Sequence, residues 1–146
     1  MKYLTIAIVL LLSPLVAAQG KNIGTVHLTH VSPSEDNAVW LRENQITPMY
    51  PMELARNGIA GCGVFKVIVD ESSKTEEVTL VSSVPQEVIV KLASKVIESW
   101  DWKVAEGHTA KREEKTIRLD FCMVANSSDE EAKRQCVAQS KLVCEI

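Results

Sequence analysis

The chain has 146 residues, of which 46% are hydrophobic and 24% are charged, and its formal net charge is −3. This composition is typical of a single folded domain and excludes a mainly disordered chain. The balance of 16 Lys and Arg residues against 19 Asp and Glu residues argues against a nucleic-acid binder, because such proteins usually present a basic face to the phosphates. We therefore expect one globular domain with no nucleic-acid partner.

The first 18 residues have the pattern of an export signal. Lys2 precedes an apolar run, Pro14 interrupts that run, and Ala18 is a small residue of the kind that signal peptidases prefer. We expect residues 1–18 to be a signal peptide that is cleaved after Ala18. The alternative is an uncleaved membrane anchor, but residues 3–18 fall short of the ~20 apolar residues that span a bilayer.

Residues 19–47 are predicted to form an N-terminal extension. Within it, residues 24–31 alternate loosely between apolar and polar side chains, which favours a short edge strand. Pro51 then suits the first turn of a short helix, and Gly58 suits the left-handed position that ends one.

Residues 59–69 and 77–81 are predicted to be the two strands of a hairpin, because polar turn residues separate two β-type runs. A helix follows, opened by residues 83–86. Its apolar side chains recur every four residues at Val88, Leu92, Val96 and Trp100, and Ile89, Ala93 and Ile97 widen this stripe.

Residues 115–124 alternate cleanly and predict a third strand. Residues 126–146 are a C-terminal tail, in which Ser128 and Glu131 have the spacing of a capping box, so we expect a tail helix over residues 129–139. The expected fold is α+β. It has a three-stranded antiparallel sheet in the order 2-1-3, one main helix on one face, a short N-terminal helix and a C-terminal tail helix. The expected core consists of Phe65, Val67, Leu92, Val96, Trp100, Leu119 and Phe121.

Four cysteines in an exported protein suggest two disulfides. Strand parity places Cys62 and Cys122 on the sheet face away from the main helix, at neighbouring strand ends. We therefore predict the pairs Cys62–Cys122 and Cys136–Cys144. The alternative is a tail that folds over this outer face, so that Cys136 or Cys144 reaches Cys62.

The motifs of common enzymes are missing from the sequence. It contains no glycine-rich phosphate loop, no HExxH and no Cys-x-x-Cys. His27 and His30 are three apart in a predicted strand and so point to opposite faces, which prevents them from chelating one ion. Glu113 and Glu114 are expected to be solvated. We predict no enzyme activity, no catalytic residue, no cofactor, no metal and no small-molecule substrate.

An ordered set of motifs runs through the predicted domain. It begins with Tyr50-Pro51 and continues with Gly58-Ile59-Ala60-Gly61 and the alternating strand with Phe65, Val67 and Val69. Val78, Leu80, Ser82 and Pro85 follow, then the helix end at Trp100 and Trp102 and the strand with Ile117, Leu119 and Phe121. This set resembles the C-terminal domain of TonB, the periplasmic energy-transducing protein of Gram-negative bacteria. The resemblance implies a TonB C-terminal-like domain over residues 48–125.

The resemblance implies a periplasmic, non-enzymatic protein–protein interaction module. Its partner would be a periplasmic segment of an outer-membrane or envelope protein, added as an extra strand along the edge of residues 116–124. Tyr50, Arg118 and Asp120 are the candidate contacts. The first alternative is an energy transducer for outer-membrane transport, held at the inner membrane by an uncleaved signal. The second is a disulfide-stabilised structural domain whose tail closes the edge and which binds no peptide.

Overall fold

The computed structural model describes residues 22–44, 47–85 and 88–145. The expected signal peptide, residues 1–18, lies outside these described residues. Within the described ranges, no helix combines the length and the apolar character that crossing a membrane would require.

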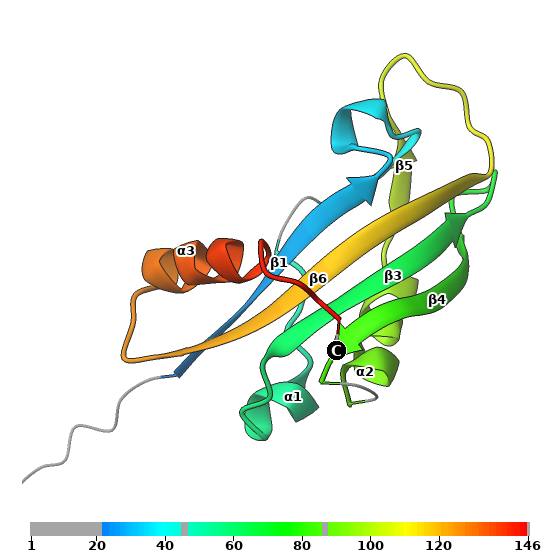
Figure 1. Cartoon of the computed structure of the whole chain (residues 1–146). Helices are drawn as coiled ribbons and strands as arrows, with labels where there is room; N and C mark the ends of the chain where they lie inside the picture. Colours follow the sequence, from blue (N-terminus) through cyan, green and yellow to red (C-terminus); the bar gives the residue numbers. More distant parts are fainter. Residues whose placement is uncertain (1–21, 45–46, 86–87, 146) are drawn as a thin grey trace, which may run out of the picture.

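A four-stranded antiparallel sheet forms the centre of the fold (Figure 1). Its strands lie in the order β1 (Asn22–Ser32), β6 (Glu113–Ala125), β3 (Gly61–Val69) and β4 (Thr75–Val84). The expected order of three strands is present as β4-β3-β6, but the prediction of a three-stranded sheet is wrong. β1 extends the sheet by pairing with β6 from Asn22, opposite Ala125, to Ser32, opposite Thr116.

β1 is the edge strand expected within the N-terminal extension, but it is longer than residues 24–31. Threonine and histidine side chains interrupt its apolar pattern, so its length and its partner were hidden in the sequence. Because β1 occupies one side of β6 and β3 the other, β6 is a central strand and not an edge.

The main helix, α2 (Val88–Glu98), packs on the inner face of β3 and β4 (Figure 1). Its buried residues are Ile89, Ala93 and Ile97. Val88 is 45% exposed, and Leu92, Val96 and Trp100 are only partly buried. The helix is therefore rotated by about one residue, ~100°, from the expected stripe. The expected core is confirmed for Phe65, Val67, Leu119 and Phe121. Leu92 and Trp100 pack against it but are only partly buried, as is Val96, so the expected full burial of these three is wrong.

Several short elements complete the inner layer. α1 (Met52–Arg56) follows Pro51 and ends before Gly58, which has a φ of +62° and so occupies the expected left-handed position. A second, two-stranded sheet pairs β2 (Trp40–Arg42) with β5 (Trp102–Val104). A short 3-10 turn, η1 (Glu35–Asn37), precedes β2.

The tail helix, α3 (Asp129–Gln139), packs on the outer face of the sheet, against β1 and β6 (Figure 1). Its bounds are those expected from the sequence. The hydroxyl of Ser128 accepts a hydrogen bond from the Glu131 N–H at 3.2 Å, which confirms the predicted cap. After α3 the chain crosses the outer face from β6 toward β4.

Candidate functional site

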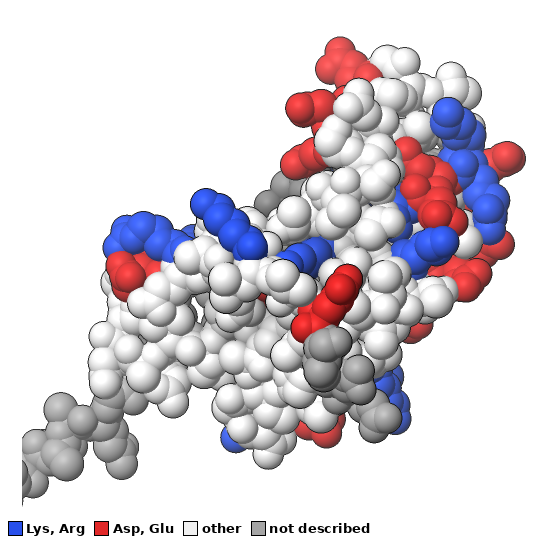
Figure 2. Space-filling view, viewed as in Figure 1, with Lys and Arg blue, Asp and Glu red and all other residues white. Residues whose placement is uncertain are grey.

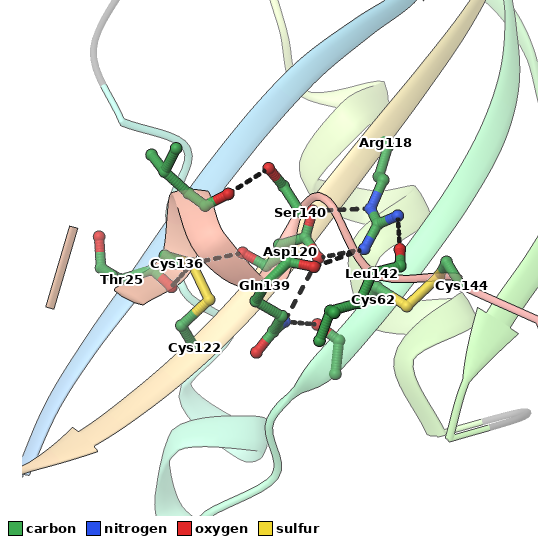
Figure 3. A network of polar contacts seen from close by, with 12 residues as sticks. Thr25, Cys62, Arg118, Asp120, Cys122, Cys136, Gln139, Ser140, Leu142 and Cys144 are labelled. Carbon is green, nitrogen blue, oxygen red and sulfur yellow. Dashed lines mark hydrogen bonds and ion pairs between the residues drawn. A yellow bond between two sulfur atoms is a disulfide. The ribbon is translucent and has the colours of Figure 1, made fainter. Parts of the chain in front are cut away.

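The disulfides join the tail to the sheet. Cys62 is bonded to Cys144 and Cys122 to Cys136, with Cα–Cα distances of 5.9 and 5.5 Å (Figure 3). The predicted pairs Cys62–Cys122 and Cys136–Cys144 are wrong. Both strand cysteines lie on the outer face of the sheet and face the tail, as their positions in the strand alternation predicted. However, Asp120 lies directly opposite Cys62, so Cys122 is displaced by two residues along β6 and each strand cysteine takes a partner from the tail.

Arg118 and Asp120 lie beneath the tail (Figure 3). The Arg118 Nε and Nη2 atoms donate to the two Asp120 oxygens at 2.8 Å each, and the side chains are 11% and 0% exposed. Arg118 also donates to the carbonyl oxygens of Leu142 at 2.6 Å and Gln139 at 3.2 Å. These two candidate contacts therefore hold the tail onto the sheet, and a partner meets them only where the tail has moved aside.

Gln139 completes this polar network. Its side-chain Nε2 donates to the carbonyl oxygen of Gly61 at 3.0 Å and to Asp120 Oδ1 at 3.3 Å (Figure 3). The buried Asp120 carboxylate is thus paired with a guanidinium and hydrogen-bonded by an amide, which offsets the cost of removing its charge from water.

Tyr50 is a packing residue of the inner layer. Its hydroxyl donates to the Ile59 carbonyl oxygen at 2.7 Å, and its ring meets the edge of the Phe121 ring at a centroid distance of 5.6 Å. The ring also lies under Gly24 of β1, where a Cβ atom would come within 3.2 Å of it. Burial raises the pKa of Tyr50 to about 12. The structure thus places this third candidate contact between α1 and the sheet, with its hydroxyl already engaged.

A buried ion pair fixes the start of β6 to β2. The Lys115 ammonium donates to the Trp40 carbonyl oxygen at 2.9 Å and to Glu113 at 3.0 Å, and the Lys115 side chain is fully buried. Glu113 also accepts hydrogen bonds from the N–H groups of Val39 and Trp40 at 2.8 and 3.1 Å. The expectation that Glu113 is solvated is therefore wrong. The alternation of side chains in β6 could have predicted that Lys115 is buried, since Lys115 falls on the same face as Ile117.

The two edge strands of the sheet, β1 and β4, differ in how far other segments cover their free sides. Beside β1, two hollows of about 280 and 220 Å³ are lined in common by Val26, His27 and Thr47, so the segment that begins at Thr47 runs next to this edge. β4 has β3 on one side, and no other described strand pairs with its outer side. Of the two edges, that of β4 is the more open.

The side chains along the open edge of β4 differ between the middle of the strand and its start. Thr79, Leu80 and Val81 in its middle are exposed, Val81 by 58%. Toward the start of β4, Glu76 pairs with Arg112 at 2.7 Å. Figure 2 shows charged side chains of both signs gathered over that end of the sheet. The pairing with β3 shifts register in two places, which is a common feature of edge strands.

The described residues contain no group of three or more His, Cys, Asp and Glu side chains arranged to hold a metal ion. His27 and His30 lie opposite Asp120 and Ile117, on different faces of the sheet, as expected from their spacing.

Comparison with known families identifies the domain. Residues 46–123 match the model of the Gram-negative bacterial TonB protein C-terminal domain. The chain belongs to this family. Domains of the family are periplasmic, non-enzymatic interaction modules that bind envelope or outer-membrane proteins. A search of curated proteins found no match. The matched range contains α1, β3, β4, α2, β5 and β6, whereas β1, β2 and α3 lie outside it.

Proposed function

We propose that this chain is an exported interaction module that binds an extended periplasmic segment of an envelope or outer-membrane protein along the open edge of β4. The single observation that carries the proposal is that no strand of the described residues pairs with the outer side of β4, along which Thr79, Leu80 and Val81 are exposed. An unpaired strand offers N–H and C=O groups to a second extended chain, and alternate side chains of that chain meet the neighbouring surface.

The proposed binding edge is β4 and not residues 116–124, which the sequence had led us to expect, and the difference has a physical reason. Residues 116–124 lie in β6, where all of them already pair with β1 and residues 116–121 pair with β3 as well. A segment that bound there would have to displace β1, which pairs with β6 along nearly its whole length. Binding at β4 requires no such displacement, so it costs less free energy.

Photo-crosslinking in Gram-negative cells tests the proposal. Benzoylphenylalanine replaces Val81 on β4 in one variant and Val31 on β1 in the matched control. These side chains are 58% and 54% exposed and stand on opposite edges of the sheet. The expected result is an adduct with an envelope protein at position 81 only. An adduct at position 31 only would assign the binding to β1.

A structural domain without peptide binding is the second candidate function. The covered β6 edge and the two disulfides between tail and sheet favour it. The absence of adducts at both positions 81 and 31 would support this function over the first.

The energy-transducer alternative requires an uncleaved N-terminus, so a different experiment distinguishes it from the exported module. A signal cleaved after Ala18 leaves Gln19 as the first residue and removes the link to an inner-membrane motor. N-terminal sequencing of the protein from cells decides between them, since a retained Met1 would support the anchored form.

A further inference from the structure

The last residues of the chain cross the outer face of the sheet with little apolar burial. Leu142 and Val143 are 65% and 80% exposed, and Cys144 is the only buried residue in the range 140–145. Arg118 of the sheet donates a hydrogen bond to the Leu142 carbonyl oxygen in this range. The Cys62–Cys144 bond is therefore the main connection between these residues and the sheet.

The preceding helix is attached by more than its disulfide. Ala132 and Cys136 of α3 are buried against the sheet, and Ser128 caps the helix. The Gln139 side chain at its end donates to Gly61 and Asp120. The Cys136 sulfur lies 3.4 Å from the Asp120 carbonyl oxygen, beneath the helix. The N–H groups of Ser140, Lys141 and Leu142 donate to carbonyl oxygens at the end of α3, so the segment is held by the helix at its start and by the Cys144 disulfide at its far end.

We propose that residues 140–145 form a redox-sensitive strap, closed by the Cys62–Cys144 disulfide and released by a dithiol reductant. The reductant's thiolate attacks one sulfur and its second thiol completes the exchange. The Cys62–Cys144 bond breaks, each cysteine sulfur gains one electron and one proton, and the reductant closes to its own disulfide. α3 remains in place, because Cys122–Cys136 and its buried side chains still hold it.

Release of the strap changes the surface beside β4. Arg118 loses the Leu142 carbonyl oxygen, and the outer face of β3 at Cys62 becomes accessible. Cys62 is opposite Val84 on β4. The strap therefore covers sheet surface directly adjoining the open edge, and its redox state determines how much of that surface is exposed.

The two disulfides differ in access, which predicts the order of reduction. All four cysteines are nearly buried, since Cys62 and Cys144 are 6% and 4% exposed and Cys122 and Cys136 are 3% and 1% exposed. What covers the two bonds differs, because Cys144 belongs to a short, largely exposed segment, whereas Cys136 lies on the buried side of α3. Thiol–disulfide exchange requires direct access of the attacking thiolate to a sulfur. Cys62–Cys144 is thus expected to open first.

Timed alkylation of the native protein in dithiothreitol measures this order. Peptide mass mapping at each time point should show Cys62 and Cys144 labelled at least about tenfold faster than Cys122 and Cys136, because only the former pair is accessible without undocking α3. Trypsin cleavage after Lys141 should then release residues 142–146 while α3 stays protected from hydrogen exchange. Labelling of all four cysteines at one rate would overturn the proposal.

Two double variants provide the matched control. Replacing Cys62→Ser and Cys144→Ser should speed trypsin cleavage after Lys141 without a reductant, and replacing Cys122→Ser and Cys136→Ser should leave that rate unchanged. A cleavage rate in the first variant equal to that of the wild-type protein would contradict the strap. If circular dichroism shows that either variant does not fold, the labelling order in the wild-type protein decides the question by itself.

Discussion

At the scale of single residues, the interior holds an ionised pair that ties two sheets together. Burial lowers the pKa of Lys115, and Glu113 partly offsets this. Burial also raises the pKa of Glu113, but the hydrogen bonds from Val39, Trp40 and Lys115 outweigh it and keep the pKa below its usual range. Each partner therefore stabilises the charge of the other.

Glu113→Ala should destabilise the protein strongly, by about 3–5 kcal/mol, because it leaves the buried Lys115 charge unpaired and two backbone N–H groups without an acceptor. Glu114→Ala is the matched control. Glu114 pairs with Lys66 at the surface, where the two side chains are 55% and 45% exposed, so its loss should cost about 0–1 kcal/mol. Urea denaturation measures both, and equal costs would contradict the buried pair.

His30 makes stability depend on pH. Burial lowers its pKa from 6.5, and the charges of Lys115 and Arg42 lower it further, while Glu35 opposes them. The folded state therefore binds a proton less readily than the unfolded state. This contribution to stability is complete above the unfolded pKa of ~6.5 and is lost as the pH falls toward the folded pKa.

His30→Gln should thus flatten the decline in unfolding free energy between about pH 7 and pH 5, since the group that titrates is gone. His108→Gln, in the exposed turn after β5, is the control and should keep the wild-type slope. Urea denaturation across this pH range measures the slopes. A His30→Gln slope equal to that of the wild type would contradict the assignment.

At the scale of elements, the orientation of α2 distinguishes two adjacent residues. Ile97 is fully buried against the sheet, whereas Val96 is only partly buried and lines the surface near Trp100. Ile97→Ala should cost about 2–5 kcal/mol, because it leaves a cavity in the core, and Val96→Ala should cost clearly less. Thermal denaturation compares the two variants. A larger loss of stability for Val96→Ala than for Ile97→Ala would instead support the helix face inferred from the sequence.

Sequence patterns predicted the elements better than their partners. The alternation of β6, the cap at Ser128 and the glycine at 58 are local signals, and each element they predicted is present. The stripe on α2 was broad, with apolar residues at adjacent positions, so periodicity alone did not select its buried line. Pairings depend on long-range packing. Nothing in the local pattern of β1 specified that it would cover β6, or that Asp120 would be opposite Cys62.

The same limit applied to the candidate site. Parity correctly placed Arg118, Asp120 and Cys122 on the outer face, but it did not choose between the predicted disulfides and the alternative of a tail folded over that face, which the Cys62–Cys144 bond confirms. Tyr50 was a candidate contact, although a turn residue before a short helix is also compatible with packing. Its hydrogen bond to Ile59 and its ring contact with Phe121 are tertiary interactions that only the structure provides.

At the scale of the whole molecule, the elements outside the family match surround those inside it. β1 closes one side of β6, α3 covers the outer face of β1 and β6, and the following strap crosses from β6 to Cys62 of β3. Both additions act on the strand that the sequence had indicated as the binding edge. β4, at the opposite side of the sheet, remains uncovered by any described strand. This arrangement is why we place partner binding at β4.

Amide hydrogen exchange of the free, oxidised protein, resolved by residue, tests this arrangement most directly. Amides paired on both sides exchange slowly, whereas every second amide of an open edge faces water and exchanges fast. We expect slow exchange throughout residues 116–121, which pair with both β1 and β3, and alternating fast and slow exchange in residues 77–80, which lie between the two register shifts of β4. Alternating exchange in residues 116–121 with uniform protection of residues 77–80 would contradict this arrangement.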